Sequence, residues 1–580
     1  MSAPAPLRTT AVLTCVLALA GCAPEQVAEF DDDAPTDAAE TGEETAPSPE
    51  ETEESAPGES SEETESPASD AEDEEAVNVE RTFLARGDEV TLEAYIHPVV
   101  RQDELAAVHL QFDNTEGDTN RLSPRNFLQG VVSMRQGAGG QVRLVDTEAM
   151  TVSHVGNAEH PGSILGHIAA GENRGREGDL LEWVGYFDAP EGDSIHLMLP
   201  EFGLIEVPVI DGELDDVEPE NEGVQEVIEE MTEIETHTYD LMSWRESHHY
   251  AVDIEGEETT VSLPSDVLFD VDSSALSEDA DEALESAAEE MSGTEGGELQ
   301  IVGHTDNVLD EEYNQVLSEE RAEAVHQRLE KLADLDAFGS VEVRGESFRE
   351  PIADNDTDEG RSLNRRVELQ FTTLQSTEDT RDYSGEVPEA SGVRAADGEV
   401  LEYIEEDGGS FELQVESLER SGNVMVGAIR VEQLADEGHL HDPLCTALCQ
   451  PNQHEQRGMN MPQLLVGDYR VDPLRYFRDG EVEEGDDKEG FDRTGSSVLG
   501  NVFIGGTGGT DAGDYATVHI LWPAVDAETV SLDVPAEDDY EYGMLASVTG
   551  VTPWRIDNVP VTDALAEGSD LSDDDAADDR

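Results

Sequence analysis

The spacing of apolar residues changes twice along this chain of 580 residues. In residues 81–214 and 392–563, apolar side chains tend to occupy every second position, as Val108, Leu110 and Phe112 do. This period is typical of strands with one buried face. Between these segments, in residues 255–375, short strand patterns alternate with helical spacing. The sequence therefore predicts a multidomain protein, in which two all-β sandwich domains flank a central α/β domain.

The two flanking segments share a pattern. The run Val530–Val534 ends at Pro535, as the run Ile195–Leu199 ends at Pro200, and a Val-Pro-Val sequence follows in each segment. We expect two related sandwich domains, which resemble extracytoplasmic immunoglobulin-like modules in a generic way that implies no chemistry. Residues 224–246 have weak helical periodicity and predict a helix within a linker.

The N-terminus has the pattern of an export signal. Arg8 is the only charge before the apolar run Ala11–Ala20, which is too short to span a membrane stably and is followed by Gly21 and Cys22. This ending resembles the lipobox of bacterial lipoproteins, which implies cleavage after Gly21 and a lipid on Cys22. The lipid would then anchor the chain to a membrane. An ordinary secretory signal with a chance cysteine is the alternative.

Acidic residues dominate the composition and are concentrated behind this signal. The formal net charge is -107, from 31 basic and 138 acidic residues, and residues 22–80 contain no Lys, Arg or His. A tract of this kind cannot bury enough apolar surface to fold, so we expect a disordered acidic stalk. Residues 564–580 form a second acidic tail. The negative field repels phosphate backbones, which excludes nucleic acid as an expected partner.

The central segment predicts a βαβαβ order with one further strand. Strands are expected at 267–271, 299–303, 341–344 and 367–371. Helices are expected after the N-cap candidate Ser277 and over 314–332. In the second helix, Leu317, Arg321, Val325 and Leu329 share a face. A charge in this apolar row needs a partner, either Asp306 in a structural ion pair or an anionic ligand.

Several motifs in this segment form an ordered set. They are Leu268–Asp272, Gly303–Asp306, Tyr313-Asn314, Arg321-Ala322 and Gly360–Glu368. Together they resemble the OmpA-like C-terminal domain family. The resemblance implies noncovalent binding of peptidoglycan through the diaminopimelate of its stem peptide.

The resemblance also implies roles for individual residues. Asp306 would hold the ammonium group and Arg321 the carboxylate of the ligand, with hydrogen bonds from Asn314 and Thr305. Asp272 would line the same pocket. A free amino-acid end carries both charges, and the forked guanidinium of arginine suits a carboxylate. For Arg365 and Arg366, ligand contact and pairing with acids that fix the last strand both stay open.

Other patterns in the sequence are weaker evidence for a function. Cys445 and Cys449 predict a disulfide in an oxidising compartment. With His439, His441 and His454 they would also suffice for zinc, although their spacing matches no common zinc signature. The segment Asp354–Arg365 fails the pattern of a calcium loop. We expect no metal, no cofactor and no catalysis, because the sequence shows no convincing nucleophile and base.

These observations predict a lipid-anchored cell-envelope protein that ties a membrane to peptidoglycan. The membrane is either the outer membrane or the outer face of the cytoplasmic membrane. An envelope hydrolase with its site near His439–His454, or an adhesin or sensor that binds envelope proteins, is the alternative. The expected division is 1–21 signal peptide, 22–80 acidic linker, 81–214 β-sandwich, 215–254 linker and helix, 255–375 peptidoglycan-binding domain, 376–391 linker, 392–563 second β-sandwich and 564–580 acidic tail.

Overall fold

The structure is a computed structural model that describes most of residues 76–563. Within that range it leaves out 86–87, 117–141, 159–180, 218, 220–233, 248, 271–272, 278–279, 295, 373–382, 384, 386, 397, 405–407, 436–441, 445–461, 477–496, 499, 502–511 and 537–551. The expected signal peptide, Cys22, nearly all of the acidic linker, the acidic tail and the Cys445–Cys449 pair lie outside the described residues, as do His439, His441 and His454.

The N-terminal strands form one ten-stranded sheet in the order β1-β2-β4-β3-β9-β8-β5-β6-β10, with β7 paired to β4. Strands far apart in this order, such as β2 and β8, contribute Leu92 and Leu197 to one core, so the sheet folds over on itself. The strands are β1 Val77–Ala85, β2 Asp88–Ile96, β3 Val99–Gln102, β4 Leu105–Glu116, β5 Arg143–Asp146, β6 Thr151–Ala158, β7 Leu181–Asp188, β8 Ser194–Leu199, β9 Gly203–Asp211 and β10 Ile234–Asp240.

The helix predicted within 224–246 is wrong over the residues that the structure describes. Residues 234–246 form β10 and β11 (Met242–Glu246) instead. All five residues of β11 are buried. The helical spacing rested on Val227, Met231 and Ile234, and only the last of these lies among the described residues, at the start of β10.

The C-terminal strands divide between two sheets that share one core. Leu413 and Val431 of the first sheet pack in the same cluster as Leu464 and Leu532 of the second. The first sheet contains β18 Leu401–Ile404, β19 Ser410–Ser421, β20 Val424–Gln433, β25 Gly500–Asn501, β26 Tyr515–Pro523 and β29 Thr562–Asp563. The second contains β17 Val393–Ala396, β21 Gln463–Val466, β22 Tyr469–Val471, β23 Arg475–Tyr476, β24 Ser497–Val498, β27 Thr529–Val534 and β28 Trp554–Pro560.

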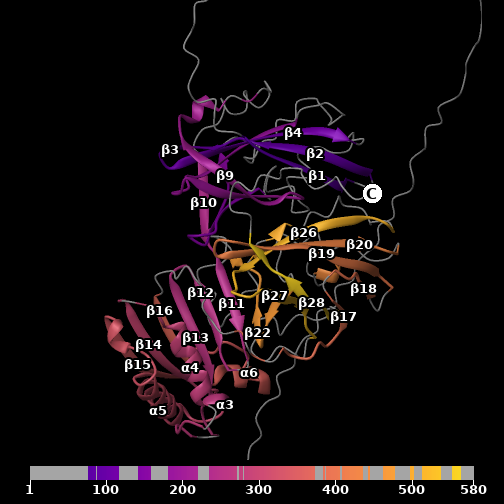
Figure 1. Ribbon diagram of the computed structural model, residues 1–580. Helices are drawn as coiled ribbons and strands as arrows, with labels where there is room; N and C mark the ends of the chain where they lie inside the picture. Colours follow the sequence, from indigo (N-terminus) through magenta and orange to yellow (C-terminus); the bar gives the residue numbers. More distant parts are fainter. Residues whose placement is uncertain are drawn as a thin grey trace, which may run out of the picture. The chain divides into compact units, whose positions relative to one another are not determined.

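The central segment combines a mixed sheet with helices (Figure 1). Strand β14 runs parallel to β15 and antiparallel to β16, and β13 continues the sheet beyond β16. Apolar side chains of α4 and α5 pack with this sheet in one core. The elements are β12 Ala251–Glu255, β13 Glu258–Pro264, α3 Ser265–Leu268, α4 Ala280–Glu290, β14 Glu298–His304, α5 Glu311–Leu329, β15 Ser340–Ser347, α6 Asp358–Asn364 and β16 Arg366–Thr372.

Two local predictions in this segment have different outcomes. The strand predicted at 267–271 is wrong, because Ser265–Leu268 form a helical turn and Phe269 makes only an isolated bridge to Leu276. A short buried apolar run has the same pattern in either conformation. The cap predicted at Ser277 is confirmed, since its Oγ accepts a hydrogen bond from the amide of Ala280 at 3.0 Å.

The central sheet continues into C-terminal strands. Strand β13 pairs with β12, β12 with β11, and Arg245 and Glu246 of β11 pair with Val471 and Arg470 of β22. The segment 215–254, expected as a linker with a helix, therefore supplies strands to two sheets. Among the described helices, none is both long and apolar enough to cross a membrane.

Candidate functional site

Two glycines let helix α5 lie close to the sheet. A Cβ at Gly303 of β14 would come within 2.2 Å of the carbonyl oxygen of Ser318. A Cβ at Gly345 of β15 would come within 2.4 Å of the Glu319 amide nitrogen. Side chains larger than hydrogen at either position would push the helix away. The glycines thus set the position of the α5 residues that face the sheet.

The loop between β14 and α5 carries the first predicted site residue. Asp306 accepts a hydrogen bond on Oδ1 from the amide of Val308 at 3.1 Å. The buried Asn314 donates from Nδ2 to the carbonyl oxygens of Asp306 and Leu309, at 3.1 and 3.2 Å. Asn314 therefore fixes the loop that aims the carboxylate. Asp310 caps α5, because its side chain accepts from the amide of Tyr313.

Thr305 is the first residue of this loop. It is buried, and its Oγ1 has no hydrogen-bond partner in the structure. Its amide donates to the carbonyl oxygen of Ser347 at 2.7 Å. Ser347 has a positive φ of 55° and its amide donates to Ser318 Oγ at 3.1 Å. These bonds connect the start of the loop, the end of β15 and the inner face of α5.

Arg321 lies on the inner face of α5 and is buried. Its Nε donates to the carbonyl oxygen of Ser273 at 3.1 Å, and its guanidinium carbon lies 5.1 Å from the centre of the Phe269 ring. The cation–π geometry and the hydrogen bond offset part of the cost of burying this charge. The ion pair between Asp306 and Arg321, predicted as the structural alternative, is absent from the ion pairs of the described residues.

Asp306 pairs with Arg365 instead. Arg365 Nη1 lies 3.1 Å from Asp306 Oδ2, and Arg365 Nη2 lies 2.6 Å from Asp266 Oδ2. Burial opposes ionisation of Asp266, but hydrogen bonds and charge from Arg365 outweigh it and hold the pKa of this carboxyl below its usual value. The same hydrogen bond raises the pKa of Arg365, because it stabilises the charged form of both partners. Sequence analysis did not predict Asp266 as a partner of Arg365.

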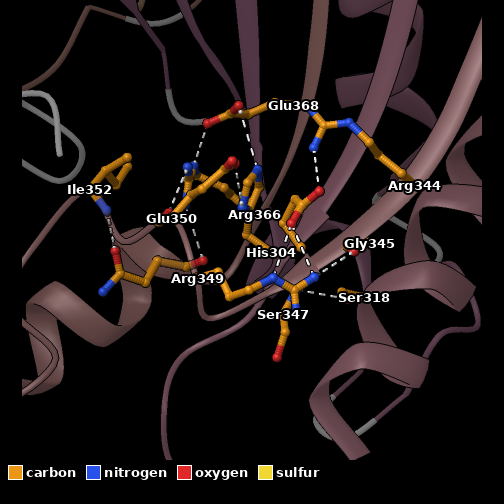
Figure 2. A network of polar contacts seen from close by, with 12 residues as sticks. His304, Ser318, Arg344, Gly345, Ser347, Arg349, Glu350, Ile352, Arg366 and Glu368 are labelled. Carbon is orange, nitrogen blue, oxygen red and sulfur yellow. Dashed lines mark hydrogen bonds and ion pairs between the residues drawn. The ribbon is translucent and has the colours of Figure 1, made fainter. Parts of the chain in front are cut away.

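A second charged cluster lies on β16 and β14, where Figure 2 shows Arg366, Glu368 and His304 together. Arg366 Nε donates to Glu368 Oε1 at 2.6 Å, and both side chains are buried. His304 Nε2 lies 3.5 Å from Glu368 Oε2. Although burial opposes ionisation of Glu368, the charge of Arg366 lowers the pKa of this carboxyl below its usual value. Pairing of Arg365 and Arg366 with acids is thus confirmed.

The predicted site residues are held by connected elements. Thr305 and Asp306 lie in the β14–α5 loop, Asn314 lies in the first turn of α5, and Arg321 lies two turns further along this helix. Asp272 lies outside the described residues. Sequence reasoning missed Asp266 and Glu368; an available signal for Glu368 was the opposite charge of Arg366 two positions earlier, on the same face of the strand.

Comparisons with known proteins address this segment. Residues 268–365 match the model of the OmpA family, so the chain contains an OmpA family domain there. Outer-membrane lipoprotein YfiB of Pseudomonas aeruginosa is 40% identical over 107 residues, which are 18% of this chain and 62% of the relative. Outer membrane porin F of the same organism is 38% identical over 110 residues, which are 19% of this chain and 31% of the relative.

The chain thus spans less than two thirds of either relative. The solved structure of the cell wall anchor of the T6SS from Pseudomonas aeruginosa is 29% identical. The match covers 22% of this chain and 88% of that chain, with a TM-score of 0.19.

Proposed function

We propose that this chain is a cell-envelope protein that binds peptidoglycan noncovalently through the diaminopimelate of the stem peptide. One observation carries the proposal: the OmpA family domain holds a fixed carboxylate at Asp306 and a fixed guanidinium at Arg321. The free end of diaminopimelate has an ammonium and a carboxylate. Asp306 takes the ammonium, and Arg321 takes the carboxylate through its charge and forked donors.

The rest of the site supports this assignment. Asp306 keeps 15% of its side chain exposed, so an entering ammonium can reach it. The side-chain oxygen of Thr305 has no hydrogen-bond partner, and Asn314 fixes the loop through the carbonyl oxygen of Asp306. We include Asp272 as a further lining residue on the strength of its place in the motif Leu268–Asp272.

We further propose that the N-terminus anchors the chain to a membrane through a lipid on Cys22. The acidic stalk 22–80 then joins the lipid to the folded part, and the chain ties the membrane to the wall. The curated relatives named an outer-membrane lipoprotein and an outer membrane porin support a place in the envelope. The flanking β domains serve as spacers or bind envelope partners, and we assign no catalysis to the chain.

Sedimentation with purified peptidoglycan tests the proposal. Full-length protein should pellet with a wall that contains diaminopimelate, and far less with one that has lysine there, because lysine lacks the second carboxylate. Asp306→Ala should abolish pelleting, whereas Asp336→Ala, an exposed acid of the same domain, should not. Equal pelleting of the wild type and Asp306→Ala, with folding confirmed by circular dichroism, would contradict the proposal.

A further inference from the structure

Arg365 binds two carboxylates unequally. Its Nε and Nη2 donate to Oδ1 and Oδ2 of Asp266, at 3.3 and 2.6 Å. Its Nη1 donates one hydrogen bond, to Asp306 Oδ2, at 3.1 Å. A guanidinium that binds a carboxylate through two hydrogen bonds is held more strongly, and in a stricter orientation, than through one. Arg365 therefore belongs mainly to Asp266, and its bond to Asp306 is the easier one to exchange.

Other bonds hold Asp266 beside Arg365 without any help from Asp306. Asp266 lies in the first turn of α3, and the amide of the preceding Ser265 donates to the carbonyl oxygen of Arg365 at 2.8 Å. The hydroxyl of Ser362 donates to Asp266 Oδ2 at 3.2 Å. Loss of the contact between Arg365 and Asp306 therefore leaves the pair of Asp266 and Arg365 in place.

The two oxygens of Asp306 have separate partners. Oδ1 accepts from the amide of Val308 at 3.1 Å, which orients the carboxylate, and Oδ2 accepts from Arg365. A ligand ammonium that approaches Oδ2 competes with Arg365, because two cations at one carboxylate oxygen repel each other. The affinity for the ammonium then depends on how firmly Arg365 holds Asp306, and Asp266 competes for the same guanidinium.

We propose that Asp266 is a positioning residue for the wall ligand: it retains Arg365 while the ligand ammonium replaces this arginine at Asp306. This inference rests on the proposed function and adds a residue that acts on the site through another side chain. Without the charge of Asp266, Asp306 is the only carboxylate paired with Arg365 among the described residues. The ammonium then has to displace a more firmly held guanidinium, and binding weakens.

A double-mutant cycle tests this role. The full-length chain in detergent is titrated in a calorimeter with a disaccharide tripeptide that ends at diaminopimelate. Asp266→Asn should weaken binding about fivefold, because Arg365 then competes for Asp306 alone. In a chain that also carries Arg365→Gln, the same substitution should change affinity by less than about 1.5-fold, because no guanidinium is left for Asp266 to hold. Asp281→Asn breaks the pair with Arg328 in the same domain and should leave affinity unchanged.

The second background separates a positioning role from the other roles that Asp266 could have. An equal loss of affinity with and without Arg365 shows that Asp266 acts on the ligand by its own charge or only supports the fold, and overturns the inference. Unchanged affinity of Asp266→Asn overturns it as well. The side chain of Asp266 is 56% exposed, so the variant should fold, and Asp266→Glu, which keeps the charge, should bind within about twofold of the wild type. Failure of the wild type to bind the tripeptide contradicts the proposed function itself.

Discussion

Arg365 and Asp306 are joined by an ion pair of 3.1 Å. The carboxylate assigned to an incoming ammonium therefore already faces a guanidinium, which Asp266 holds from the other side at 2.6 Å. Asp306 does not depend on Arg365 for its orientation, because the amide of Val308 also binds it. The two arginines near the site thus have opposite expected effects: Arg321 attracts the ligand carboxylate, and Arg365 repels the ligand ammonium.

Replacement of Arg365 by Gln should strengthen binding of a diaminopimelate-containing muropeptide. Removing the positive charge of Arg365 leaves the negative charge of the Asp306 carboxylate uncompensated, although solvent screens the effect because 27% of the Arg365 side chain is exposed. We expect affinity to rise roughly threefold, as measured by calorimetry. Arg361→Gln, on helix α6 just before Arg365 and paired with Asp358, is the matched control and should leave affinity unchanged. A weaker complex for Arg365→Gln would show that this residue itself contacts the ligand.

Replacement of Arg321 by Gln should have the opposite effect. The ligand carboxylate loses its cation, and the expected loss of affinity is at least tenfold. Arg328→Gln is a suitable control, since Arg328 lies on the same helix but pairs with the exposed Asp281. Pelleting assays and calorimetry should agree. If both variants bind like the wild type while remaining folded, Arg321 has a structural role only.

The elements that position the site were predictable where apolar spacing is regular. Strand β14, helix α5 and the cap at Ser277 followed from period and capping alone. Helix α5 begins and ends three residues earlier than predicted, and it begins earlier because Asp310 caps it before its apolar row begins. The helical spacing of Val227, Met231 and Ile234 did not predict β11, and the apolar run Val267–Phe269 fits a strand as well as the helical turn α3.

The partners of charged residues were harder to predict than the charged residues themselves. Arg321 stood out as a cation in an apolar row, yet its contacts with Ser273 and Phe269 depend on a loop that precedes α4. Asp266 and Arg365 lie 99 residues apart and meet only because α3 and the end of α6 converge. Such pairs follow from tertiary packing, which local patterns do not encode.

Replacement of Gly303 by Ala should destabilise the central domain. The new methyl group would meet the backbone of Ser318, which cannot move without shifting α5. We expect a loss of about 3 kcal/mol in the free energy of unfolding, from overpacking. Gly293→Ala is the comparison variant. The φ of Gly293 is 82°, which strains an alanine, but no atom lies near its Cβ, so we expect a loss of about 1 kcal/mol in the free energy of unfolding. Urea unfolding followed by circular dichroism measures both, and equal losses would contradict the close approach.

Replacement of Glu368 by Gln should destabilise the same domain by about 3 kcal/mol near neutral pH, because the buried Arg366 loses its counter-charge. The pKa of Glu368 is lowered in the folded protein, so its contribution is complete above the unfolded pKa near 4.5 and declines as pH falls below it. The difference between wild type and variant should therefore shrink in acid. A difference that stays constant down to the acid unfolding of the wild type would contradict this.

Glu201 and His519 should set the pH range over which the strands around them are most stable. Both side chains are buried, and His519 lies against Gly203, where a Cβ would come within 2.8 Å of its ring. Burial and the charge of Glu416 raise the pKa of Glu201 from 4.5 to about 8. Burial and the charge of Arg81 lower the pKa of His519 from 6.5 to about 4.

The directions of these two pKa shifts predict a pH range in which stability changes little. The folded protein keeps a proton on Glu201 that the unfolded chain releases, so stability falls as pH rises from 4.5 to about 8. The folded protein keeps His519 neutral, so stability falls as pH drops from 6.5 to about 4. Between pH 4.5 and 6.5 the effects of Glu201 and His519 on stability oppose each other. From pH 6.5 to 8 only Glu201 of these two acts, and stability falls by about 1.4 kcal/mol per pH unit. Glu201→Gln should abolish that loss, as measured by hydrogen exchange of β8, β9 and β26 at constant ionic strength. Unchanged exchange of the variant relative to wild type at pH 8 would contradict a protonated Glu201 in the fold.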